Sequence, residues 1–441
     1  MRHSQQPSPS PARTPDTGSA STGTGTGRRP PVRTGWVIPT LALGGFGIGT
    51  TEFVAMGLLP NIASSLTVSE PTAGNLIAAY ALGVVVGAPL ITAFAARVPR
   101  RRLLIWLMIA FTAGNGLSVV APDYPTLLAA RFVAGLPHGA YFGVAALVAA
   151  HVAAPGRRAR AVGQVMLGLS VANVLGVPAA TWIGQALGWR PALALVVLIG
   201  AATVAALIRV LPGLDDMATS DMRAELGALR NTQVLLTLAV GMIGFGGMFA
   251  FYSYLNTALT SVGGVPEGIV PVALMLFGLG MVAGNVVGGR LADRNVDLGV
   301  IAGLLAVGVA LAVFALLLGN GWLAVPFAFV VGGTGSMAIP ALQTRLMDVA
   351  EDGQTVAAAM NHSALNIANA LGAWLGGVVI AAGLGYRAPS LVGAALAFGG
   401  VAVAVAAVAR ARRSGDGSAD RPRERPVDLI EPVPATVDTR G

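Results

Sequence analysis

The six residues Val171-Ala172-Asn173-Val174-Leu175-Gly176 return in nearly the same form as Ile367-Ala368-Asn369-Ala370-Leu371-Gly372. The two copies are 196 residues apart, and three further matches occur at an offset of 197. These matches pair Gly188-Trp189-Arg190-Pro191 with Gly385-Tyr386-Arg387-Ala388, Arg97 with Arg294, and Gly135 with Gly332. Matches at a nearly constant offset indicate an internal repeat, in which the two halves of the chain carry equivalent elements.

Long apolar segments fill both halves. Charged residues make up 11% of the 441 residues and hydrophobic residues 54%, whereas a typical soluble domain has about 25% charged residues. A helix needs about 20 mainly apolar residues to cross the hydrocarbon layer of a bilayer. Twelve segments meet this length, approximately 36–59, 73–96, 103–121, 125–151, 161–187, 190–211, 234–259, 268–292, 298–319, 322–347, 355–382 and 388–409.

The repeat and the apolar segments together predict the fold class. We expect an all-α membrane protein with twelve transmembrane helices in two parallel six-helix repeats. The predicted parts are a disordered tail at 1–35, a first six-helix bundle at 36–211, a linker at 212–233, a second six-helix bundle at 234–410 and a disordered tail at 411–441. Both tails are rich in polar and small residues, which is typical of disorder.

The arginines predict the orientation in the membrane. The chain has no Lys, and 25 of its 28 Arg residues fall in the tails or in the connections on one side of the predicted bundle. Cytoplasmic loops carry the excess of basic residues. We therefore expect a multi-pass protein of the cell membrane with both termini and the linker in the cytoplasm.

Several classes of function are excluded by composition. Without Cys there is no disulfide framework, thiol catalysis or Cys-ligated metal. Without Lys there is no phosphate-binding loop for ATP. The Arg residues follow the membrane topology, so the net charge of +8 does not indicate a nucleic-acid partner. We expect no enzyme activity, no cofactor and no metal.

Three residues are candidates for proton coupling. Glu52 alone among 20 acidic residues lies well inside a predicted helix, where a carboxylate is costly and is usually partnered or transiently protonated. A permanently neutral, hydrogen-bonded Glu52 is the alternative. Arg131, the only basic residue inside a predicted helix, should lie about 9–12 Å deep, as Glu52 does, so we predict that they meet. His138, two turns further along, could relay a proton or make a structural hydrogen bond.

Other residues are candidates for substrate binding and gating. Phe249, Tyr252 and Asn256 share one face of the seventh helix, and such a face suits the binding of a partly apolar or sugar-like solute. Tyr252 could equally belong to a belt of aromatic residues at the membrane interface. The run from Arg131 to Gly143 places Gly135 and Gly139 at the spacing of close helix packing. Asp293 and Arg294 could latch two helices in one transport state, or form an ordinary exposed pair.

Five stretches carry a resemblance to a known family. They read GTTEFVAMGLLP at 49–60, ALGVVVGAP at 81–89, LPHGAYFG at 136–143, VANVLGVP at 171–178 and FAFYSY at 249–254. Residues from about 36 to 410 thereby resemble the major facilitator superfamily, and within its twelve-helix drug:proton antiporters the arabinose (sugar) efflux permeases and the neighbouring chloramphenicol-resistance exporters.

The resemblance implies roles for single residues. Arg131 matches the buried Arg of the fourth-helix motif, and Gly176 and Pro178 match a reduced form of the fifth-helix antiporter motif, in which Asn173 is a candidate substrate contact. Asp293 and Arg294 match the loop motif in its second-half copy. The first-half copy reads ARVPRR at 96–101. It keeps Arg97 but lacks the usual Asp, so its latching role is expected to fall to Asp293.

These observations favour a proton-coupled exporter of a small organic solute, such as a sugar-like compound or an amphenicol drug. Two bundles would rock around a site at the membrane midplane. A second hypothesis keeps the fold but reverses transport, giving a proton-coupled importer or facilitator, and a third is a membrane-embedded enzyme or scaffold. The sequence leaves sugar, drug and nucleoside substrates open. We expect a monomer whose partners are the solute, protons and the lipid bilayer.

Overall fold

The computed structural model describes residues 34–95, 98–154, 157–214, 231–350 and 354–413. Within these ranges the chain is helical without any strand, and twelve segments are long and apolar enough to cross a membrane. The predicted number of membrane-spanning helices is thus confirmed. The tails at 1–33 and 414–441, Arg97 and most of the predicted linker lie outside the described residues, so the predicted domain boundaries stay a prediction.

The first half of the molecule holds six of these spans. Its elements are α1 (Val37–Gly57), α2 (Leu59–Ser65), α3 (Glu70–Phe94), α4 (Arg100–Val120), α5 (Tyr124–Val152), α6 (Arg158–Val171), the π-helical turn η2 (Ala172–Gly176), α7 (Val177–Leu187) and α8 (Trp189–Val210). The elements α6, η2 and α7 follow one another without a break and form a single span.

The second half holds the other six spans. Its elements are α10 (Thr232–Gly244), α11 (Gly246–Ser253), α12 (Leu255–Thr257), the π-helical turn η4 (Ala258–Val262), the short turn η5 (Glu267–Ile269), α13 (Val270–Arg294), α14 (Val296–Leu317), α15 (Gly321–Met337), α16 (Ile339–Val349), α17 (Gln354–Ala381) and α18 (Ala388–Arg413). One span combines α10 with α11, and another combines α15 with α16.

Glycines let helices of each half cross with their backbones in contact. A Cβ built on Gly135 of α5 would overlap the carbonyl oxygen of Tyr80 in α3, and one built on Gly332 of α15 would overlap that of Phe277 in α13. Tyr80 and Phe277 are also 197 residues apart. Both halves therefore use the same crossing at the same place, which confirms the internal repeat.

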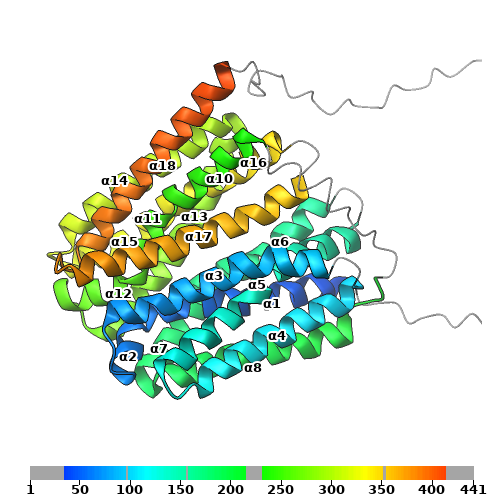
Figure 1. Ribbon diagram of the computed structural model, residues 1–441, viewed down its shortest axis with the longest axis horizontal. Coiled ribbons are helices and arrows are strands. Elements are labelled where there is room, and N and C mark those ends of the chain that lie inside the picture. The colour runs from blue at the N-terminus through cyan, green and yellow to red at the C-terminus, as the bar shows by residue number, and fades with distance from the viewer. Residues whose placement is uncertain (1–33, 96–97, 155–156, 215–230, 351–353, 414–441) are drawn as a thin grey trace, which may run out of the picture.

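Figure 1 shows the two halves side by side, with α1 to α8 in blue to green and α10 to α18 in green to red. They meet along α3 and α17, and where α13 lies against η2 and α7. We call this contact surface the seam. The end of the bundle where α1 begins and α18 ends is called the tail end, and the opposite end, which carries α2 and the start of α13, the distal end.

Candidate functional site

Glu52 lies in the seam, on α1. Its side chain is 7% exposed, and its Oε1 accepts a hydrogen bond from Nδ2 of Asn369 in α17 at 3.4 Å. The next residue, Phe53, also crosses the seam, since its ring stacks on Phe249 of α11 with centroids 6.3 Å apart and makes an edge contact with Tyr252 at 5.6 Å. The one acid predicted inside a helix thus lies where the two halves touch.

Arg131 binds the residue before Glu52, not the carboxylate itself. Its Nη1 donates to Oγ1 of Thr51 at 3.0 Å and its Nη2 to the carbonyl oxygen of Thr51 at 3.1 Å. The guanidinium carbon also lies 4.4 Å from the centre of the Tyr80 ring. Arg131 attracts Glu52 electrostatically, but among the described residues the two form no ion pair. Arg131 thus lies beside the residue before Glu52, and its hydrogen bonds go to Thr51 in place of the expected direct pair with the carboxylate.

His138 is joined to Arg131 through Tyr80. The Tyr80 hydroxyl lies 3.1 Å from Nδ1 of His138, which is 2% exposed. The His138 ring contacts Phe142 one turn further along α5, and Phe142 stacks in parallel on His362 of α17 with centroids 5.7 Å apart. A series of polar and aromatic groups therefore runs from the neighbourhood of Glu52 to a second histidine across the seam.

The predicted substrate residues separate into two groups. Phe249 and Tyr252 are buried against Phe53 in the seam, and the Tyr252 hydroxyl has no hydrogen-bond partner among the described residues. Asn173, on η2, keeps an unpaired Oδ1. Asn256 differs, because its Nδ2 donates to the carbonyl oxygen of Gly57 at 2.6 Å. The structure thus places Asn256 in a bond between the halves nearer the distal end.

A polar stripe on α17 was missed at the sequence level. His362, Asn366 and Asn369 follow at spacings of four and three residues, which puts them on one face of the helix. His362 contacts Phe142 and Asn369 contacts Glu52, so this face meets the first half. The signal that could have found Asn369 is the internal repeat, in which it is the counterpart of Asn173.

Polar contacts join the halves at the distal end. Thr257 donates to Oε2 of Glu70 at 2.6 Å, and Nε2 of Gln185 donates to the backbone carbonyl of Glu267 at 3.1 Å. Tyr386, in the connection between α17 and α18, also contacts Glu70. Burial, the charge of Glu70 and the hydrogen bond to Glu70 raise the pKa of Tyr386, so its hydroxyl remains a donor at neutral pH.

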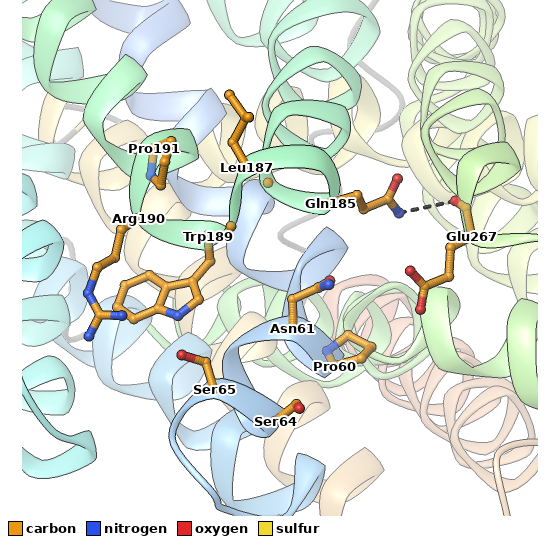
Figure 2. A pocket seen from close by; sticks show the side chains of 12 residues that line it. Pro60, Asn61, Ser64, Ser65, Gln185, Leu187, Trp189, Arg190, Pro191 and Glu267 are labelled. Carbon is orange, nitrogen blue, oxygen red and sulfur yellow. Dashed lines mark hydrogen bonds between the residues drawn. The ribbon is translucent and has the colours of Figure 1, made fainter.

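A pocket of about 590 Å³ opens at the distal end. Figure 2 shows its wall, where the side chain of Gln185 reaches the backbone of Glu267 and the Arg190 side chain runs along Trp189. The residues that line it come from α2, α7, α8 and the loop before α13. It contains none of the residues around Glu52, and the bond from Gln185 to Glu267 that joins the halves lies in its wall.

The residues predicted to take part in gating lie in different surroundings in the structure. A Cβ on Gly139 would press on Ala88 and one on Gly176 on Thr50, so these glycines serve close packing. Pro178 follows the π-helical turn η2. Asp293 and Arg294 are exposed and make no ion pair within the described chain. Within the described residues, an ion pair instead joins Asp297 of α14 to Arg345 of α16. No described group of acidic or His side chains could hold a metal ion.

Known proteins resemble this chain in sequence or in fold. Residues 41–362 match the family model of the Major Facilitator Superfamily. Inner membrane transport protein YdhP of Escherichia coli (strain K12) is 42% identical over 358 residues, which cover 81% of this chain and 92% of that protein. The chloramphenicol resistance protein of Streptomyces lividans is 34% identical, covering 80% and 90%. The crystal structure of a D-xylose-proton symporter superposes with a TM-score of 0.67 over 84% and 96% of the chains at 15% identity, which shows the shared fold.

Proposed function

The chain belongs to the major facilitator superfamily and is a multi-pass inner-membrane transporter of small solutes, and we propose that it exports its solute in exchange for protons. As a transporter it is not an enzyme. A relative named for chloramphenicol resistance supports the direction of transport. Alternating access would expose the seam first to one side of the membrane and then to the other.

The observation that carries this proposal is the position of Glu52. It is buried in the seam and bonded across it to Asn369. Any movement that separates the halves changes the surroundings of this carboxylate, so its protonation and the opening of the seam are coupled. A proton and a solute that both depend on the same seam then compete, which is the requirement for exchange.

Arg131, Tyr80 and His138 support the acid from the first half. Arg131 donates one hydrogen bond to the side chain of Thr51 and one to its backbone carbonyl, and it supplies a positive charge close to Glu52. Without it, burial would favour the neutral carboxyl throughout the cycle. Through Tyr80, His138 continues the polar series toward the tail end, and it is our candidate for passing a proton between Glu52 and that side.

The orientation in the membrane completes the proposal. The excess of Arg at the tail end favours cytoplasmic termini. With this orientation the contacts Thr257 to Glu70 and Gln185 to Glu267 lie on the outer side and close it. Reporter fusions at Gly213 and after Arg413 should read cytoplasmic, and fusions at Asp123 or Glu267 external. An external reading at Gly213 contradicts the orientation.

Accumulation in inside-out membrane vesicles tests the exchange. Vesicles that are acidified inside should take up a labelled solute from a panel of arabinose, chloramphenicol, thiamphenicol and uridine. Glu52→Gln should lose this uptake while keeping the protein folded, and Glu267→Gln, which changes an exposed distal acid, should keep it. Gradient-driven uptake by Glu52→Gln would refute the role of Glu52. Uptake driven by the opposite gradient would make the protein an importer.

A further inference from the structure

Three asparagines of the seam present their side-chain carbonyl oxygens without partners. Asn173, Asn366 and Asn369 are 1%, 4% and 0% exposed, and the Oδ1 of each has no hydrogen-bond partner among the described residues. Each of their amide nitrogens makes one hydrogen bond. Asn173 donates to the Leu169 carbonyl and Asn366 to the His362 carbonyl, both at 3.0 Å, and Asn369 donates to Glu52. Each residue therefore offers a buried acceptor oxygen that no described group uses.

Two of these residues are linked through their neighbours to the aromatic contact of Phe53 and Tyr252. Asn369 is bonded to Glu52, the neighbour of Phe53, and Asn366 lies on the same face of α17. On the other side the backbone of Asn173 lies against Gly278, whose neighbour Phe277 packs on Tyr252 with centroids 4.5 Å apart. The Tyr252 hydroxyl is itself unpaired.

Unpaired acceptors in the seam are costly, because a buried polar group that loses water without gaining a partner is destabilising. Two of these three residues, Asn173 and Asn369, occupy equivalent places in the internal repeat. The same group at equivalent places on opposite sides of the seam indicates a shared partner between the halves. Such a partner must bring hydrogen-bond donors.

The cation that acts on Glu52 is held mainly by groups of the first half. Arg131 is 2% exposed, and two of its nitrogens donate to Thr51 while its guanidinium lies over the Tyr80 ring. A carboxylate in the seam would meet Asn oxygens and Glu52, while the charge of Arg131 is already engaged by Thr51, Tyr80 and Glu52. Like charge and unpaired acceptors both repel an anion.

We propose that the seam selects an uncharged solute rich in O–H or N–H donors, which bind the oxygens of Asn173, Asn366 and Asn369 while an apolar part of the solute packs on Phe53, Phe249 and Tyr252. This inference rests on the proposed export function and names the chemical class of its substrate. Carboxylated solutes of the same size are excluded.

Matched solutes that differ by one donor test the proposal. Thiamphenicol and florfenicol differ where one hydroxyl is replaced by fluorine, and arabinose and 2-deoxy-2-fluoroarabinose differ in the same way. In acidified inside-out vesicles the half-saturating concentration should be at least about tenfold lower for the hydroxyl member of a pair, since the loss of one buried hydrogen bond leaves an acceptor unpaired. Arabinonate, which carries a carboxylate, should not be taken up.

Variants at Asn366 test whether this residue causes the preference for the hydroxyl member of each pair. Asn366→Asp keeps an acceptor oxygen and should keep the preference for the hydroxyl member. Asn366→Leu, of similar volume, removes the acceptor and should bring the two members of a pair close together. Because Leu can disturb folding, thermal unfolding of each purified variant is measured first, and the preference is read as a ratio within one variant, so the amount of folded protein cancels.

Each remaining outcome has a meaning. Equal uptake of both members of each pair by the unaltered protein overturns the donor class and leaves proton-driven export standing. Gradient-driven uptake of arabinonate in place of the uncharged solutes does the same. An unchanged preference in Asn366→Leu removes Asn366 from the site. Absence of gradient-driven uptake for every solute counts against the proposed function as well as the substrate class.

Discussion

The two copies of the repeated motif differ in backbone. Residues 172–176 form a π-helical turn, whereas 367–372 lie within the regular helix α17. Pro178 follows the first copy, and the equivalent position in the second copy is Trp374. Proline has no N–H to donate to Val174 and its ring crowds that carbonyl, so the helix widens just before it. The same motif therefore presents Asn173 and Asn369 from different backbones.

The two halves differ even more in their polar residues. At an offset of 197, the counterparts of Glu52, Tyr80, Arg131 and His138 are Phe249, Phe277, Ala328 and Gly335. The glycine crossing is kept in both halves, but Glu52, Tyr80, Arg131 and His138 have no charged or polar counterpart at these positions of the second half. The comparison indicates that the repeat supplies a symmetric scaffold, and that the proposed proton coupling belongs to one half of it.

The largest expected effect comes from moving the acid between halves. The double variant Glu52→Gln, Phe249→Glu should remain without gradient-driven uptake, as Glu52→Gln alone does, because Ala328 and Phe277 provide neither the charge nor the hydroxyl that accompany Glu52. Uptake into acidified vesicles is the measurement. Recovery of uptake would show that the halves are interchangeable and that Arg131 and Tyr80 are not required.

Removal of Arg131 should come next. Arg131→Ala takes away a positive charge close to Glu52, which favours the neutral carboxyl, so the pH profile of solute binding should move to higher pH and gradient-driven uptake should fail. Arg131→Lys keeps the charge but cannot reproduce both bonds to Thr51, so recovery should be partial.

A thermodynamic cycle with Glu52→Gln gives the control for this prediction. Solute binding is measured against pH in Arg131→Ala with and without Glu52→Gln. The shift should vanish when Glu52 is already replaced. Equal shifts in both backgrounds would leave Arg131 with a role in packing α5 against α1.

Substitutions at the equivalent glycines Gly135 and Gly332 should separate an effect on stability from an effect on proton coupling. Gly135→Ala and Gly332→Ala each place a methyl group against a backbone carbonyl and should lower the free energy of unfolding by about 1–3 kcal/mol, as overpacking does. Only Gly135→Ala should also reduce uptake per folded molecule, because it displaces Tyr80, which lies between Arg131 and His138. Thermal unfolding and uptake are measured together. Equal losses of uptake would contradict the assignment of coupling to the first half.

The smallest effect is expected at the π-helical turn. Pro178→Ala restores an N–H that can donate to Val174, so the turn should relax toward a regular helix, and uptake should change by no more than a few-fold. Hydrogen exchange at residues 174–178 should slow in the variant. Unchanged exchange would mean that contacts to α1, such as Gly176 against Thr50, hold the turn rather than Pro178.

Much of the scaffold could be predicted from sequence, because helix length in a membrane and the internal repeat both follow from residue spacing. Glu52 lies eight residues before Pro60 and Arg131 six after Pro125, and this spacing predicts that the two residues lie at similar depths. The partner of Arg131 could not be predicted, since depth does not give direction around a helix axis. The three-dimensional fold was needed to show that its two donating nitrogens are directed at Thr51.

Pairings between spans were missed for the same physical reason. Asp293 and Arg294 are adjacent in sequence and exposed, whereas Asp297 meets Arg345 only because α14 and α16 pack together. The stripe of His362, Asn366 and Asn369 is visible as a spacing, but other polar residues on α17 obscure it. Its direction toward Glu52 depends on how the two halves meet.

The distal contacts respond unequally to solution conditions. The bonds from Asn256 to the Gly57 carbonyl and from Gln185 to the Glu267 carbonyl join neutral groups. Because salt screens charges, a change in ionic strength should affect these two hydrogen bonds little. The bond from Thr257 to Glu70 ends on a carboxylate that acid can neutralise. High salt should therefore leave this end of the transporter shut, whereas acidity on that side acts on a single carboxylate that is separate from Glu52.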